Sequence, residues 1–399
     1  WFLRTNDWYP HQDLSDMEGS NRSGVANVSL MTDAGNYVQA PIKERYRLRS
    51  RPVALEQPWD IDELGNGDLL VTQSVGRLSR IDPETWEQEN ISFRNDYKSD
   101  DTTGLLGLET LQKDGQDIVY LYYTYDKGDL FRKHRVSRFV LVDGELRNET
   151  VLIDSIPGSK WHSGGRLDIG PDNRLYITTG DANTMLSAGD EELLAGKVLR
   201  VNLDGTIPEG NPGKSPIFIK GLRNPQGLAW QPGTDKLFIT EHGLVHNDAV
   251  RVGTNGDDLG WPIQRCGINY LDKYSINDTS ISSINESYRG YFDGYLKFRD
   301  SEINLSGSKD FCTGNWTIAP SGAAYISGTN SDMDGELLVA GMRGKHIHHF
   351  EIENGKITDN FVGGFRDMEG HSGRYRHVEQ IGDSIYVLGK YSGMYQIPT

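Results

Sequence analysis

The chain has 399 residues, of which 36% are hydrophobic and 25% are charged, so its composition is that of a folded protein with a sizeable core. The net charge of −16 at pH 7 argues against nucleic acid and anionic membranes as partners, because both are negatively charged. No run of about 20 apolar residues is present, so the sequence predicts no membrane span.

The N-terminal part of the sequence differs from the rest. Residues 1–44 are polar, rich in Asn, Ser and Asp, and show no repeated pattern. We expect them to form an extension that packs on or near the following domain. The stretch 45–57 alternates polar and apolar residues and is expected to supply a closing strand to the last repeat of that domain.

From residue 58 onward a weak repeat recurs: a short apolar segment, a turn with Gly or Asp, and a strand ending in Thr or Gly. Its six copies start at 58–61, 104–108, 165–169, 227–230, 322–325 and 378–381. A second pair of strands is predicted to follow each copy, as in 76–81 and 196–201. Six units of four strands predict an all-β, six-bladed β-propeller of four-stranded antiparallel blades over 45–399, whereas a jelly roll or sandwich would rarely repeat one motif six times. The longest irregular segment is 244–316, where functional loops are expected.

Two features favour an exported protein, either secreted, periplasmic or extracellular. Cys266 and Cys312 are the only cysteines and are candidates for one disulfide, with two free buried thiols as the alternative. Asn-x-Ser/Thr sequons number eight, against roughly three expected by chance, and predict a glycoprotein. They begin at Asn21, Asn27, Asn90, Asn148, Asn277, Asn285, Asn304 and Asn315. A chain that starts at Trp1 has either lost a signal peptide or been trimmed.

Two clusters of reactive side chains lie next to inner strands. His162 stands in the glycine-flanked segment 161–167 and is a candidate general base, with an incidental loop histidine as the plainer alternative. Arg223 and Asn224 precede Pro225 on a constrained loop. They offer a fixed cation and donors for an anionic or quinone oxygen, with an inter-blade salt bridge as the alternative.

A third cluster is Thr240-Glu241-His242-Gly243-Leu244, at the end of an inner strand. The backbone carbonyls around Gly243 are of the type that binds calcium, although a tight turn is the alternative. His346 and His348 share one face of a predicted strand, and we interpret them as part of a solvated blade edge, not as a metal site.

Taken together, these clusters resemble the glucose/sorbosone dehydrogenase family, soluble sugar dehydrogenases that use pyrroloquinoline quinone (PQQ). The resemblance runs from about Pro58 to the C-terminus and leaves 1–57 uncovered. Its landmarks, in order, are Pro58-Trp59, Gly104-Leu105-Leu106-Gly107, His162-x-Gly-Gly-Arg166-Leu167, Thr179-Gly180-Asp181, Gly196-Lys197-Val198-Leu199-Arg200, Arg223-Asn224-Pro225-Gln226-Gly227-Leu228, Thr240-Glu241-His242-Gly243, Gly260-Trp261-Pro262, Ile318-Ala319-Pro320-Ser321-Gly322 and Arg374-Tyr375-Arg376.

The resemblance implies an aldose dehydrogenase that oxidises C1 of its sugar to the lactone and passes electrons to an external acceptor. His162 would take the proton of the C1 hydroxyl while hydride passes to PQQ, and Arg223 with Asn224 would polarise the quinone oxygens. The resemblance further implies that Arg374 and Arg376 pair with PQQ carboxylates and that Trp316 stacks on the quinone. Arg343 stands where the family often carries a Lys that binds the cofactor. The carbonyls of Gly243 and Leu244 would hold calcium.

The sequence departs from the family pattern at several positions near this expected site. They are Thr102, Leu244, Asp248-Ala249 and Asp258-Leu259. A non-catalytic propeller that binds a protein or glycan is therefore kept as an alternative, and a calcium-dependent hydrolase or lactonase as a further one. The oligomeric state is left open, with a homodimer among the alternatives.

Overall fold

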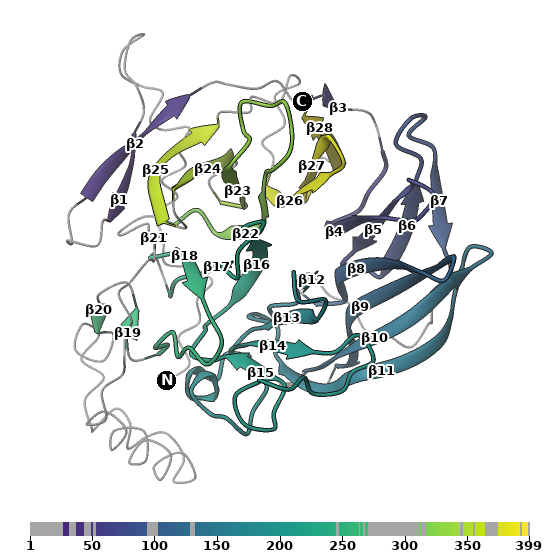
Figure 1. Ribbon diagram of the computed structural model, residues 1–399, viewed down its shortest axis with the longest axis horizontal. Helices are drawn as coiled ribbons and strands as arrows, with labels where there is room; N and C mark the ends of the chain where they lie inside the picture. The colour runs from purple at the N-terminus through teal and green to yellow at the C-terminus, as the bar shows by residue number, and fades with distance from the viewer. Residues whose placement is uncertain are drawn as a thin grey trace.

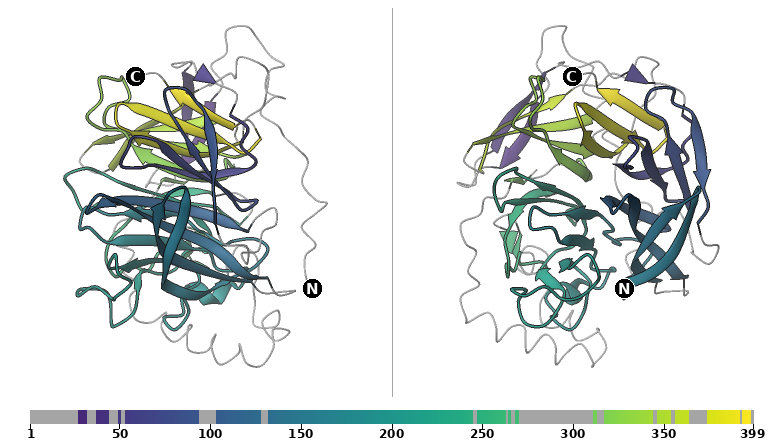
Figure 2. Two further views of the ribbon diagram at one scale, coloured as in Figure 1. Left: turned by 90° about the vertical axis from the view of Figure 1, so that its right-hand side faces the viewer. Right: turned by 45° about the vertical axis from the view of Figure 1, so that its right-hand side comes forward.

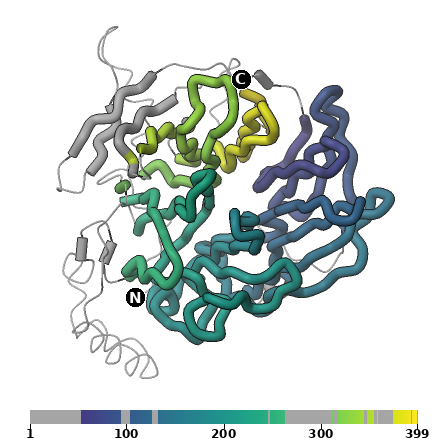
Figure 3. The backbone as a smooth tube through the Cα atoms, in the orientation of Figure 1, coloured from purple at the N-terminus to yellow at the C-terminus, as the bar shows by residue number. Residues whose placement is uncertain are grey.

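The computed structural model describes most of the chain. The described residues are 27–31, 37–43, 49–50, 53–93, 103–127, 132–244, 247–262, 264–265, 268–269, 311–312, 317–343, 346–353, 356–363, 374–391 and 393–397. Six blades stand around a central axis, each a four-stranded antiparallel sheet, so the predicted six-bladed β-propeller is confirmed (Figure 1). Figure 3 follows the same ring as a tube through the backbone.

Each blade is numbered in the order in which its innermost strand occurs in the chain. Blade one contains β4 (Pro58–Glu63), β5 (Leu69–Gln73), β6 (Arg77–Ile81) and β7 (Gln88–Ile91). Blade two contains β8 (Leu105–Lys113), β9 (Gln116–Lys127), β10 (Arg132–Val142) and β11 (Glu145–Gly158). Blade three contains β12 (Leu167–Ile169), β13 (Leu175–Thr179), β14 (Lys197–Val201) and β15 (Ile217–Ile219), with the short 3-10 helix η2 (Met185–Ala188) after β13.

The remaining blades follow the same plan. Blade four contains β16 (Pro225–Trp230), β17 (Leu237–Glu241), β18 (Ala249–Gly253) and β21 (Phe311–Cys312). Blade five contains β22 (Pro320–Tyr325), β23 (Glu336–Gly341), β24 (His346–Glu353) and β25 (Lys356–Gly363). Blade six contains β26 (Tyr375–Ile381), β27 (Ser384–Gly389), β28 (Gly393–Ile397) and the early strand β3 (Arg49–Ser50).

Two early segments of the chain pair with late blades. In β3, Ser50 pairs with Tyr395 of β28, so the predicted closing strand from 45–57 is present. The hairpin of β1 (Asn27–Met31) and β2 (Tyr37–Lys43) pairs with β21 on one side and with β25 on the other. This hairpin joins blades four and five into one ten-stranded sheet, and its purple strands lie beside blade five (Figure 1, Figure 2). A separate two-stranded ribbon contains β19 (Gln264–Arg265) and β20 (Ile268–Asn269).

The core lies between neighbouring blades. The second strand of a blade is covered on both faces, which explains why β13 reads Leu-Tyr-Ile-Thr-Thr and is buried throughout. Trp59, Leu106 and Leu167 come from three successive blades and pack in one apolar cluster. Full burial of such a side chain contributes about 1.5–3 kcal/mol, so the clusters between blades hold the ring together.

Two sequence interpretations need correction. The segment 244–316 is not wholly irregular, because β18 within it is the third strand of blade four. His348 does not lie at a solvated edge: its side chain is fully buried, and its ring stacks on Phe350 at 6.1 Å. The reason is that β24 lies between β23 and β25, so neither of its sides is free. The side chain of His346 lies outside the described residues.

Only one of the two cysteines of the predicted disulfide lies within the described residues. Cys312 is buried in β21, whereas Cys266 lies outside the described residues, so the bridge stays a prediction. Of the sequons, Asn90 and Asn148 are exposed on strands β7 and β11. Within the described residues, no helix is long and apolar enough to cross a membrane.

Candidate functional site

Antiparallel pairing of the two innermost strands places the start of the first and the end of the second at the same end of each blade. His162 precedes β12, and Asp181 follows β13. In blade four, Arg223 precedes β16 and His242 follows β17. Arg376 lies in the first residues of β26, so the predicted site residues gather at one end of the ring.

The turn that carries His162 is tightly packed. His162 has a φ of 60°, in the left-handed region, and two glycines with positive φ follow at 164 and 165. A Cβ on Gly180 would lie 1.9 Å from the carbonyl oxygen of His162, so only glycine allows the two loops of blade three to approach this closely. The turn therefore holds the imidazole in one place.

His162 is oriented by a buried carboxylate. Its Nδ1 lies 2.7 Å from Oδ1 of Asp181, and the indole nitrogen of Trp261 donates to the other oxygen at 2.9 Å. Because a carboxylate only accepts hydrogen bonds, Nδ1 carries the proton and Nε2 is the basic nitrogen. The His162 side chain is 16% exposed, while that of Asp181 is almost fully buried.

The charge state of this pair follows from its surroundings. Burial and the Arg223 guanidinium lower the pKa of His162 below 6.5, although the Asp181 carboxylate acts in the opposite direction. Burial would raise the pKa of Asp181, but its hydrogen-bonded contact with His162, the charge of Arg223 and the hydrogen bond from Trp261 lower it overall. His162 is therefore neutral and able to accept a proton at neutral pH.

Arg223 and Asn224 are fixed beside this pair. The backbone nitrogen of Arg223 donates to Glu241 at 2.5 Å, and its carbonyl accepts from the backbone of Asp181 at 2.7 Å. The Asn224 side-chain oxygen accepts from the amide of Gly164 at 3.3 Å. The structure thus brings His162, Arg223 and Asn224 together.

Gln226 and His242 extend the polar network. Gln226 donates to the side-chain oxygen of Asn224 at 3.1 Å and accepts from Arg376 at 3.1 Å. His242 lies 3.3 Å from the Asn224 amide through its Nδ1. Burial lowers the pKa of His242 to about 3, with Arg223 and Arg376 acting in the same direction, so this histidine is neutral.

Arg376 has the features of an anion-binding residue. It is only 8% exposed, and its guanidinium lies 4.1 Å from the ring centre of Trp59. Burial, with Arg166 and Arg374 nearby, lowers the pKa of Arg376 to about 9, so it remains charged at neutral pH. Among the described residues, no carboxylate forms an ion pair with Arg376. A buried cation without a counter-ion fits an anionic cofactor such as PQQ, which carries carboxylates.

The Gly243–Leu244 loop has the donor chemistry of a calcium site. No backbone amide of the described residues donates to the carbonyl oxygens of Gly243 and Leu244. These are hard oxygen donors of the kind that Ca²⁺ prefers. The described residues contain no cluster of three or more His, Cys, Asp or Glu side chains suited to a metal, so backbone oxygens would have to contribute to any such site.

Asp248 ties this loop to blade five. One carboxylate oxygen accepts from the backbone of Gly243 at 2.7 Å. The other accepts from the Thr317 hydroxyl at 2.8 Å and from the backbone nitrogens of Ile318 and Ala319 at 2.8 and 2.9 Å. The departure Asp248-Ala249 from the family pattern thus retains a carboxylate with a clear structural role.

For the other predicted site residues the structure shows fewer contacts or none. Arg343 is exposed, and its backbone nitrogen donates to Ile318 at 2.9 Å, beside the residues that Asp248 holds. Arg374 is exposed and near Arg376. Trp316 and Thr102 lie outside the described residues.

Sequence reasoning assigned no role to four residues that the structure brings into the site: Asp181, Gln226, Asp248 and Trp261. Asp181, Gln226 and Trp261 were visible only as landmarks of the family, and Asp248 only as part of a departure from its pattern. Asp181 follows a buried strand by two residues, and that position at a blade end was the available signal.

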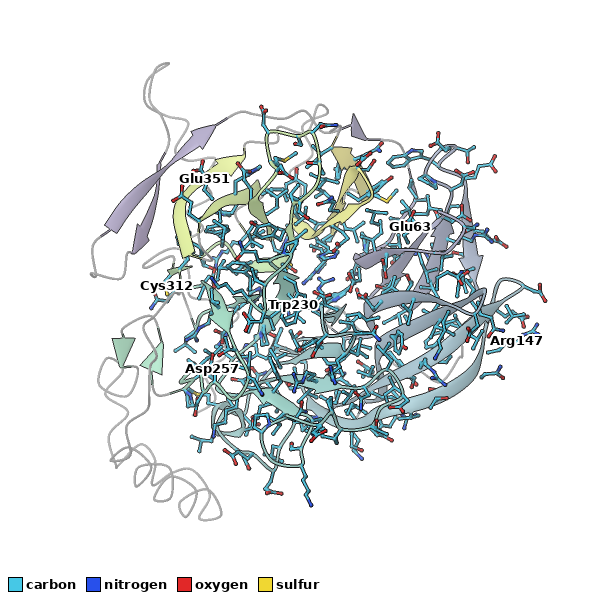
Figure 4. The ribbon with its side chains drawn as sticks, in the orientation of Figure 1. Glu63, Arg147, Trp230, Asp257, Cys312 and Glu351 are labelled. Carbon is cyan, nitrogen blue, oxygen red and sulfur yellow. The ribbon has the colours of Figure 1, made fainter. Side chains whose placement is uncertain are left out.

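A cavity of about 420 Å³ is lined by residues of the innermost strands of the blades, Trp230 among them. Figure 4 places Trp230 near the middle of the ring, whereas Arg147 lies at the outer edge of the ring. The lining of the cavity includes Asp62, Glu109 and Asp168. Burial raises the pKa of Asp62 to about 7, and burial with repulsion from neighbouring carboxylates raises the pKa of Glu109 and of Asp168 well above their ordinary values.

Comparisons with known proteins agree with this architecture. Quinoprotein glucose dehydrogenase B of Acinetobacter calcoaceticus is 30% identical over 238 residues, covering 48% of this chain and 47% of that protein. An uncharacterized protein, slr1608 of Synechocystis, is 28% identical and covers 88% of this chain and 85% of that protein. The PQQ-bound aldose sugar dehydrogenase of Streptomyces coelicolor has the same fold, with a TM-score of 0.70, 24% identity, and coverage of 90% of this chain and 99% of that one.

The model of one protein family, described as glucose/sorbosone dehydrogenase, matches residues 55–394. This match includes all six blades except β3 and the end of β28. It also includes every residue of the site described above. The chain belongs to the glucose/sorbosone dehydrogenase family.

Proposed function

We propose that this protein is a PQQ- and calcium-dependent dehydrogenase that oxidises an aldose at C1 to the lactone and passes the electrons to an external acceptor. The observation that carries the proposal is the His162–Asp181 pair. It is a neutral, oriented base beside Arg223 and Asn224. The family membership and the PQQ-bound relative support the same chemistry.

The base has a defined task in this reaction. Oxidation of C1 removes a hydride from carbon and a proton from the C1 hydroxyl, leaving the lactone carbonyl. PQQ, when bound, supplies the quinone that accepts the hydride. His162 accepts the proton at Nε2, while Asp181 holds Nδ1 and stabilises the imidazolium that forms.

The remaining site residues would bind the cofactor and polarise its quinone oxygens. Arg376, together with Arg343 and Arg374, would pair with cofactor carboxylates, and Arg223 with Asn224 would stabilise negative charge on the quinone oxygens. The carbonyls of Gly243 and Leu244 would hold calcium, and Trp316 would cover the quinone plane. We further propose that the protein is exported, with Cys266 bridged to Cys312 and its sequons glycosylated.

Reconstitution tests the proposal. Metal-stripped protein is titrated with PQQ and Ca²⁺, and glucose and other aldoses are then added with an artificial dye acceptor. Dye bleaching that needs both PQQ and Ca²⁺ supports the dehydrogenase. Absence of PQQ uptake would overturn it and favour a non-catalytic propeller that binds a protein or glycan.

A further inference from the structure

Trp161, the residue immediately before the base, is exposed. Trp161 is 44% exposed. It is one of five large hydrophobic residues that are exposed by more than a third within the described part of the chain. The others are Val151, Leu193, Ile207 and Tyr391. Single exposed apolar side chains are common at protein surfaces, but this indole belongs to the residue that directly precedes the candidate base His162.

The position of Trp161 is tied to the catalytic pair. The Ser159 hydroxyl donates to the carbonyl of Trp161 at 2.5 Å, and it accepts from the backbone nitrogen of Trp161 at 3.2 Å. Asn183 donates its side-chain amide to the same hydroxyl at 2.8 Å. The backbone of Asn183 donates to Oδ1 of Asp181 at 2.9 Å, the oxygen that also holds His162. One hydrogen-bonded network therefore fixes both the base and the backbone that presents the indole.

A contact with a neighbouring side chain does not account for the indole. The Lys160 ammonium lies 5.1 Å from the ring centre of Trp161, which is a cation–π contact at an exposed site and therefore a weak one. Such a pair leaves much of the ring open to a ligand, and it places a hydrogen-bond donor beside it. Aromatic faces with adjacent polar donors suit molecules that are apolar on one face and rich in hydroxyl groups at the rim.

We propose that Trp161 is a specificity-determining residue that stacks on the face of a pyranose ring and delivers its C1 hydroxyl to His162. The proposal rests on the function proposed above and names the substrate class of that site. A pyranose whose hydroxyl groups are all equatorial, such as β-D-glucopyranose, carries only C–H bonds on its two faces and stacks well. An epimer with an axial hydroxyl on the stacked face is a poorer substrate.

Three variants of the reconstituted holoenzyme test whether Trp161 is the platform on which the sugar ring stacks. Trp161→Ala is expected to raise KM for glucose about ten-fold, the loss typical of one stacked ring, with kcat changed less than about two-fold. Trp161→Phe retains a ring and is expected to lose less. Val151→Ala is the matched control, because Val151 is equally exposed but lies on the outer strand β11. Its KM is expected to equal that of the unchanged protein.

The preference among sugars gives a second measurement. The ratio of kcat/KM for glucose over an axial epimer such as galactose or mannose is expected to fall in Trp161→Ala. A KM and an epimer ratio that stay unchanged in this variant would overturn the platform while leaving the dehydrogenase intact. A purely structural role would instead lower the melting temperature without altering the epimer ratio.

A binding measurement separates this inference from the proposed function. Saturation transfer between the protein and glucose is recorded by NMR on the full chain, without turnover. The unchanged protein could fail to reduce the dye and still transfer saturation to glucose. If Trp161→Ala then transfers none, the stacking role of Trp161 is supported and the dehydrogenase function is refuted. If the unchanged protein shows no transfer at saturating glucose, the platform is overturned.

Discussion

The Nδ1 atom of His162 lies 2.7 Å from Oδ1 of Asp181, and this contact determines which imidazole nitrogen is basic. The Asp181 carboxylate is buried and also accepts a hydrogen bond from Trp261, so its rotation away from His162 would break a second hydrogen bond. The tightly packed turn fixes the backbone from which the imidazole extends. The site therefore presents a base in a fixed tautomer before any ligand binds.

Removal of the base should abolish turnover. In His162→Ala, kcat for aldose oxidation is expected to fall on the order of 100-fold or more, because the group proposed to take the hydroxyl proton is removed. PQQ uptake, measured by absorbance, and the melting temperature should stay near those of the unchanged protein. Unaltered sugar oxidation in this variant would refute the proposed mechanism.

Asp181→Asn tests the tautomer. An amide of the same shape can present its NH2 group to Nδ1, which favours the wrong tautomer, so kcat is expected to fall by about 10²–10⁴-fold. Asp154→Asn is the control, because that carboxylate lies on the outer strand β11 and pairs with Arg135 at the surface. Equal rates in both variants would show that Asp181 does not orient the base.

The pH dependence of kcat/KM should report the lowered pKa of His162. A base must be unprotonated, so the rate is expected to fall as the pH drops through this pKa, and the acidic limb should lie below pH 6.5. Because the folded protein binds fewer protons at His162 than the unfolded chain, stability also decreases below pH 6.5. The steady-state rate is measured from pH 4.5 to 8. An acidic limb above pH 7 would contradict this assignment.

The blades could be predicted from sequence because their inner strands carry a local pattern that repeats. Buried β13 and β17 follow turns and end in polar residues, and this pattern also places Arg223 and His162 at blade ends. The partners of these residues could not be predicted in the same way. Trp261 reaches Asp181 across 80 residues of sequence, and no local periodicity encodes that contact. The burial of His348 likewise depends on which strands flank β24, and its own alternation does not reveal them.

Asp248 is expected to set the geometry of the Gly243–Leu244 loop, which we propose binds calcium. Asp248→Asn places an NH2 group among four donors, so at least one of the hydrogen bonds to Gly243, Thr317, Ile318 or Ala319 must break. The loop should then bind Ca²⁺ about ten-fold more weakly, as expected for loss of one or two hydrogen bonds to a charged group. Calorimetric titration of metal-stripped protein with Ca²⁺ measures this. Asp257→Asn, in the exposed turn after β18, is the control, and equal affinities in the two variants would exclude a role for Asp248.

The axial carboxyl groups should make the protein less stable as the pH rises. Asp62 has a pKa of about 7, and those of Glu109 and Asp168 are raised well above their ordinary values. Between pH 4 and at least pH 7 the folded state therefore keeps protons that the unfolded chain has released, and stability falls across this window. Glu109→Gln has no carboxyl group at this position, so it removes the proton that Glu109 retains in the folded state. The decrease in melting temperature from pH 5 to pH 8, about several degrees in the unchanged protein, is expected to be smaller in this variant. Both melting temperatures are measured with EDTA so that bound metal does not contribute.

The control is Glu63→Gln, at the exposed end of β4, which should retain the full decrease in melting temperature. His162 and His242 act in the opposite direction at acidic pH but are common to all three proteins. Parallel curves for Glu109→Gln and the unchanged protein would mean that Glu109 is ionised in the fold without cost.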